Sequence, residues 1–101
     1  MDYAAAKVRQ DDLYAANSTA SKALNTFIDQ FGRGPMGLTP DHVKTMPEYR
    51  ALRASYDRSA VLLRQFNAWF TRQFSKEIRA ARKARIAMME SMIPNQQEQQ
   101  Q

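Results

Sequence analysis

The chain has no cysteine and one histidine, His42, among its 101 residues. The lack of thiols excludes disulfides and cysteine-ligated zinc. His42 has only Asp41 beside it, which is too little for a metal site or a hydrolytic triad, so we interpret it as a surface residue of a short turn. The sequence therefore predicts a protein without enzyme activity, cofactor or metal.

Glycine is scarce, with three residues, and alternating runs of β-branched residues are missing. This composition argues against an all-β fold. The three glycines lie in Gly32–Gly37, which fits the pattern G-x-G-x-x-G. A dinucleotide site needs a strand before this motif and a helix directly after it, whereas a helical pattern precedes it here and Pro35 removes a backbone donor. We interpret the segment as a loop.

Long apolar runs are also missing, and no segment approaches the ~18 apolar residues of a membrane span. The first residues, Met1-Asp2-Tyr3, begin with an acid and lack the basic-then-apolar order of a secretory signal. We expect a cytoplasmic protein that makes no membrane contact. A helix lying on a membrane surface is the weakest alternative, because the apolar face is needed for packing within the chain.

The sequence has strong helical periodicity in two segments, the first from Tyr3 to Phe31, where Gly32 stops it. Residues 32–45 are predicted to form a connector with one short helical turn, capped by Thr39 and with Pro40 at its first position. The residues of the first segment that recur at steps of three and four, and so share one face, are Tyr3, Ala6, Gln10, Leu13, Asn17, Ala20, Leu24, Phe27 and Phe31.

The second helical segment begins at a capping box, Thr45–Glu48. Nothing interrupts the pattern over residues 46–93, which predicts one helix of roughly 70 Å that ends at Pro94. Residues 95–101 are rich in glutamine and are predicted to be disordered. The apolar stripe of the second helix consists of Tyr49, Leu52, Tyr56, Leu63, Phe66, Phe70, Phe74, Ile78 and Ala81.

The two predicted helices differ in length. In an antiparallel hairpin the first, about 43 Å long, covers the second only from about Tyr49 to Ile78. Apolar residues beyond that point are typical of an interface. The predicted fold is all-α: an antiparallel helical hairpin in one domain, residues 1–94, with a long second helix, completed by a homodimer or by a host protein. The predicted interface residues are Ile86, Met88, Met89 and Met92.

Positive charge is concentrated in residues 64–85. This segment has seven basic residues and one acid, a net +6, while the rest of the chain has eight basic and nine acidic residues, a net −1. Such a stripe indicates a polyanionic or acidic partner, because like charges held together on one face destabilise the free protein. The predicted binding residues are Arg58, Trp69, Arg72, Lys76, Arg79, Arg82, Lys83 and Arg85.

Two functions remain open. The first is electrostatic association with nucleic acid or a nucleic-acid complex, with Gln65 and Asn67 as candidate base contacts. No helix-turn-helix or basic-zipper arrangement is visible, which counts against sequence-specific regulation. The second is a protein-binding modulator, such as an adaptor or inhibitor of a phage or mobile element, which docks its long helix on an acidic host protein. Trp69 either packs at the edge of the core or anchors the partner.

Overall fold

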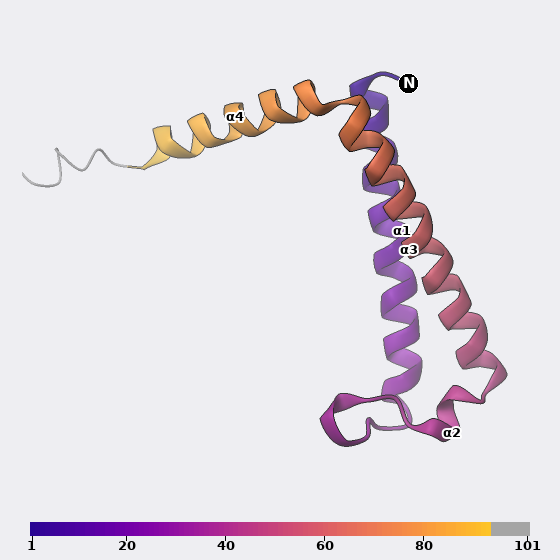
Figure 1. Cartoon of the computed structure of the whole chain (residues 1–101). Helices are drawn as coiled ribbons and strands as arrows, with labels where there is room; N and C mark the ends of the chain where they lie inside the picture. The colour runs from indigo at the N-terminus through magenta and orange to yellow at the C-terminus, as the bar shows by residue number, and fades with distance from the viewer. Residues whose placement is uncertain (94–101) are drawn as a thin grey trace, which may run out of the picture. The chain divides into compact units, whose positions relative to one another are not determined.

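The computed structural model describes residues 1–93, and within them the chain is all-α, without strands. The chain forms two compact units, Met1–Trp69 and a second unit that begins at Phe70. The predicted helix end at Pro94 and the predicted disordered tail lie outside the described residues. The elements, shown in Figure 1, are α1 (Tyr3–Asp29), the 3-10 turn η1 (Pro35–Gly37), α2 (Asp41–Lys44), α3 (Pro47–Gln73) and α4 (Ser75–Met92).

Local signals set both ends of α1. The Asp2 carboxylate accepts a hydrogen bond from the backbone N–H of Ala5 at 2.8 Å, which satisfies a donor of the first turn. At the other end Gly32 has a φ of 71°, a left-handed conformation that favours glycine. The last helical residue is Asp29, so α1 ends two residues before the predicted end at Phe31. Phe31 lies beyond the last helical residue and is 39% exposed, so its predicted place on the inward face is wrong.

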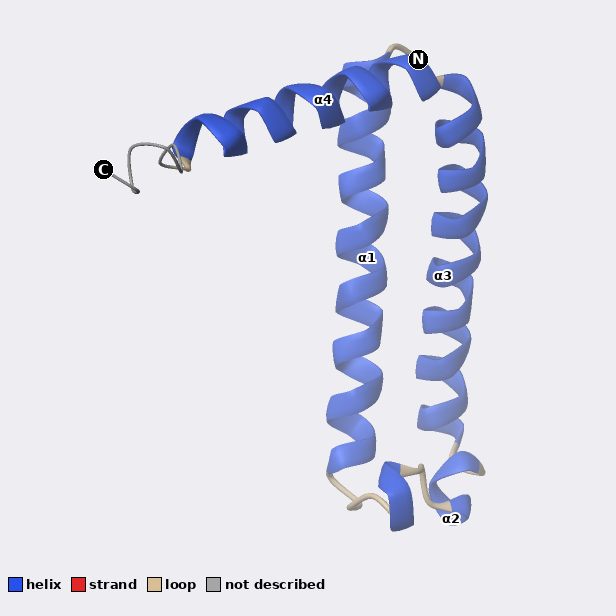
Figure 2. Cartoon of the chain, turned by 60° about the vertical axis from the view of Figure 1, so that its left-hand side comes forward, coloured by secondary structure: helices blue, strands red, loops and turns tan. Residues whose placement is uncertain are grey.

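In the first unit α1 packs antiparallel against α3 (Figure 2). The Gln10 side-chain amide donates to Asn67 Oδ1 at 2.9 Å, and the Asn17 amide donates to the Ser59 hydroxyl at 3.0 Å. Both bonds are partly buried, and a shift of the helices would leave their polar groups unpaired at a cost of about 1–3 kcal/mol each. These two pairs therefore fix the register of the hairpin.

The inward face of α1 is mostly confirmed. Ala6, Leu13 and Leu24, all on the predicted face, are buried. Val43 of α2 is fully buried, although the sequence pattern did not single it out.

Two predicted helix starts are each displaced by one residue. Pro40 has an extended ψ of 144° and occupies the cap position, so α2 begins at Asp41 and Thr39 does not cap it. The Thr45 hydroxyl donates to the His42 carbonyl at 2.9 Å and thereby closes the end of α2. The capping box is therefore not formed, and α3 begins at Pro47, whose missing N–H costs nothing at a first helical position.

Arg33 holds the connector loop together. Its guanidinium donates to the Asp29 and Asn25 side chains, both at 2.9 Å, and to the Gly37 carbonyl at 3.2 Å. The G-x-G-x-x-G segment follows a helix and folds into this loop, as the sequence indicates.

Met36 in this loop is the described non-glycine residue with a positive φ, 64°, and its side chain is 96% exposed. A left-handed conformation costs an ordinary residue about 1–2 kcal/mol, which glycine avoids. The greater freedom of glycine in the unfolded chain cancels part of this gain, because that freedom is lost on folding. We expect Met36→Gly to raise the free energy of unfolding by about 0.5–1 kcal/mol in urea denaturation. Leu38→Gly, at a φ of −77°, is the control and should not stabilise. A loss of stability in Met36→Gly would contradict the expectation.

The predicted single helix over residues 46–93 is wrong. The helix is interrupted at Phe74, which has φ −120° and ψ 31°, and α4 begins at Ser75. Neither glycine nor proline lies there. Phe74 is 6% exposed and its ring centroid lies 5.5 Å from that of Phe70. We attribute the break to burial of the Phe74 ring. The next residue, Ser75, has a low helix propensity because its hydroxyl competes for backbone hydrogen bonds.

Candidate nucleic-acid interface

The candidate site lies on α4, which is exposed over most of its length. Ile78 is half-buried, and every residue from Arg79 to Ile93 is exposed. The exposed stretch begins directly after Ile78, the residue at which the sequence predicts that the first helix stops covering the second.

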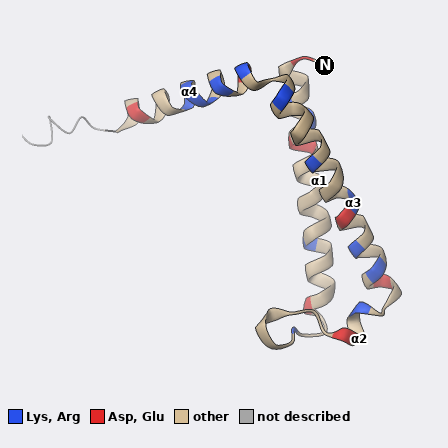
Figure 3. Ribbon diagram, in the orientation of Figure 1, with Lys and Arg blue, Asp and Glu red and all other residues tan. Residues whose placement is uncertain are grey.

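The cations of the second unit have no acidic partners within residues 1–93. Residues 70–93 have six basic and two acidic residues, a net +4. The three ion pairs of the described chain, Arg33–Asp29, Lys44–Asp41 and Arg53–Asp57, all lie in the first unit. Arg79 donates to the Ser75 carbonyl at 3.4 Å, a long and weak hydrogen bond. Lys and Arg follow one another along α4 in Figure 3, and no carboxylate of the described residues pairs with them.

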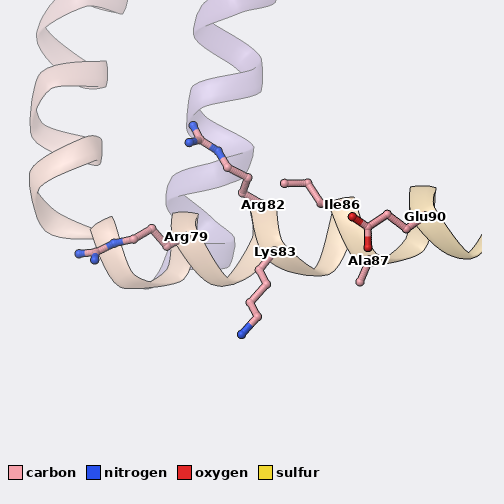
Figure 4. A pocket seen from close by; sticks show the side chains of 6 residues that line it. All are labelled: Arg79, Arg82, Lys83, Ile86, Ala87 and Glu90. Atoms are coloured by element: carbon pink, nitrogen blue, oxygen red, sulfur yellow. The ribbon is translucent and has the colours of Figure 1, made fainter.

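When the residues of α4 are placed at 100° per residue, two neighbouring strips of side chains can be distinguished. The first strip holds cations within about a 60° arc, namely Lys76, Arg79 and Lys83. The neighbouring strip is apolar with one cation and consists of Arg82, Ile86 and Met89. Arg85 lies about 60° further round. In Figure 4, Arg82 and Ile86 project from one side of the helix and Lys83 from the other.

Part of this surface is an open depression on a single helix. It is lined by Arg79, Arg82, Lys83, Ile86, Ala87 and Glu90 (Figure 4). A pocket for a small molecule encloses most of its ligand, which side chains of one helix do not do. The depression therefore suits contact with a large partner rather than a small substrate.

The predicted binding residues are distributed over both units. Arg58 and Trp69 belong to α3 in the first unit, and Arg72 lies in the last turn of α3 in the second. The others lie on α4: Lys76, Arg79, Arg82, Lys83 and Arg85. The break at Phe74 means that Arg72 and the α4 cations do not share one continuous helical stripe, which corrects the geometry predicted for them.

Trp69 and Asn67 differ from simple contact residues. Trp69 is 36% exposed and its ring centroid lies 5.4 Å from that of Phe66, so it packs and is partly open at once. Asn67 accepts from Gln10 and donates to the Tyr14 hydroxyl at 3.3 Å. This amide joins the two helices of the hairpin, and its role as a base contact stays a prediction.

The predicted interface residues are all exposed on α4: Ile86, Met88, Met89 and Met92. Their contact with a partner remains a prediction. Glu90 was not part of the predicted site, although it lies in the same arc as Lys83, about two turns further on. Its position could have been found on the helical wheel.

Within residues 1–93 no three metal-ligating side chains lie together, and no described helix has the length and apolar character to cross a membrane. Comparison with protein-family models, with curated proteins and with solved structures finds no significant match to this chain.

Proposed function

We propose that this chain is a non-enzymatic protein that associates electrostatically with nucleic acid through α4. The observation that carries the proposal is the set of unpaired cations on an exposed helix. α4 has five basic and two acidic residues, a net +3, and none of its cations pairs with a carboxylate in the described chain. Contact with phosphates would relieve their mutual repulsion and release the counterions that phosphates condense.

In this proposal the α1–α3 hairpin is the scaffold and the second unit supplies the binding element. The first unit has three ion pairs, whereas the cations of α4 have none within the described residues. Arg58 and Trp69 belong to the first unit and are not part of the proposed α4 surface, and contact of Arg72 with a partner remains a prediction.

Fluorescence anisotropy with labelled oligonucleotides across a salt series tests the proposal. We expect binding at low salt that weakens steeply, with log K falling by about 0.9 per phosphate contact for each unit of log salt on duplex DNA. Four contacts would give a slope of about −3.6. The absence of binding at low salt would overturn nucleic-acid association.

A second candidate is a protein-binding modulator, favoured by the exposed apolar residues of α4. These residues include Ile86, Met89 and Met92, whose side chains are exposed in the described chain. Methionine is flexible and adapts well to the surface of a partner. The occupant would be a second copy of the chain or an acidic surface of a host protein. This candidate gains weight if nucleic acid does not bind, and sedimentation velocity would then distinguish self-association from the need for another protein.

A further inference from the structure

The cations of α4 are not confined to one side of the helix, and this arrangement points to a particular form of nucleic acid. Taking Arg82 as the centre of the exposed face, Arg79, Lys83 and Lys76 lie about 60–120° to one side at 100° per residue. Arg85 lies about 60° to the other side. The face thus has a central arginine between two cationic flanks.

We propose that α4 binds in the major groove of double-stranded DNA, with Arg82 toward the base edges and the flanking cations on phosphates of the two strands. This inference rests on the proposed function. An α-helix with its side chains is about 10–12 Å wide, and the major groove of B-form DNA is about 12 Å wide. Ile86 and Met89, beside Arg82, would meet the apolar thymine methyl groups that line the same groove.

Single strands and duplex RNA fit this helix less well. Proteins that bind single strands stack bases on aromatic side chains, and the sequence of α4 has no aromatic residue. The major groove of A-form RNA is deep and too narrow for side chains to enter. Both observations favour duplex DNA.

Lipid and a second copy are also disfavoured as occupants of this face. Arg82 lies within the apolar arc that Ile78, Ile86 and Met89 form, so insertion of this arc into a membrane would bury a guanidinium group in hydrocarbon. A seam between two α4 helices would bring two net charges of +3 together and bury Arg82.

Glu90 indicates where the contact ends. It lies on the same side as Lys83 but about 10 Å further along the helix, and a carboxylate there would repel phosphate. The groove contact therefore extends from Lys76 to about Met89.

The test compares the full-length chain on four probes at equal salt: duplex DNA, duplex RNA of the same sequence, single-stranded DNA, and vesicles with anionic phospholipid. We expect duplex DNA to bind at least about tenfold more tightly than either other nucleic acid. Equal affinity for all three nucleic acids would overturn the groove inference and leave the proposed function intact. If none of the three nucleic acids binds, both the groove inference and the proposed function are overturned. Binding to vesicles alone would also overturn both.

A second measurement isolates Arg82. In a duplex with 7-deazaguanine in place of guanine, the N7 acceptor that arginine contacts is missing while every phosphate remains. We expect this duplex to bind wild type at least about fivefold more weakly, and Arg82→Ala to bind both duplexes equally. Arg9→Ala, at an exposed arginine of α1, is the matched control and should keep the fivefold difference. An unchanged difference in Arg82→Ala would overturn the role of Arg82, whatever its effect on overall affinity.

Discussion

The triple variant Lys76→Gln, Arg79→Gln and Lys83→Gln is expected to lose most of its affinity for duplex DNA at low salt. These three cations form one flank of α4, none has an acidic partner in the described chain, and each would neutralise one phosphate. Loss of three phosphate contacts should lower the magnitude of the salt slope by about 2.7, because each contact contributes about 0.9. Anisotropy titrations between 50 and 200 mM salt would measure both changes.

The matched control removes the same charge from the first unit. Arg9, Lys22 and Arg50 are exposed, and Arg9→Gln, Lys22→Gln and Arg50→Gln give a variant with the same net charge as the α4 variant. We expect this control to keep the wild-type salt slope, with a small loss of affinity from the weaker overall field. Equal losses in both variants would show that net charge, and not the α4 flank, accounts for binding.

Replacing Phe70 or Phe74 with alanine is expected to lower the free energy of unfolding by about 3–5 kcal/mol. The two rings are 4% and 6% exposed, and removing either leaves a cavity as well as losing apolar burial. Because their centroids lie 5.5 Å apart, the double variant should lose less than the two single losses together. Urea denaturation followed by circular dichroism would measure each value.

Phe31→Ala is the control for this series. Phe31 is 39% exposed, with its ring centroid 5.1 Å from that of Phe27. Its centroid also lies 6.3 Å from that of His42, and we expect a loss of about 1 kcal/mol or less, because the ring is exposed and buries little area. A loss below 1 kcal/mol for Phe70→Ala would mean that the inward face of α3 is assigned incorrectly.

The sequence by itself determined the helical class, the inward faces and the exposure of the C-terminal part of α4. Residues at steps of three and four along α1 and α3 are buried or half-buried with few exceptions, since an amphipathic helix buries one stripe whatever its partner. The end of α1 shortly before Gly32 also followed from the sequence, because a left-handed residue near a helix end is a local property. The concentration of positive charge in residues 64–85 could also be read from the order of the residues alone.

The break at Phe74, the register of the hairpin and the engagement of Asn67 were decided only by the tertiary structure. Gln10 and Asn67 are 57 residues apart, so no local pattern announces their hydrogen bond. Phe74 leaves the helical conformation without glycine or proline nearby, where its ring is buried beside Phe70. Local propensity differs by only a few tenths of a kcal/mol among most residues, whereas burial of an aromatic ring contributes several times more, so packing sets such a break.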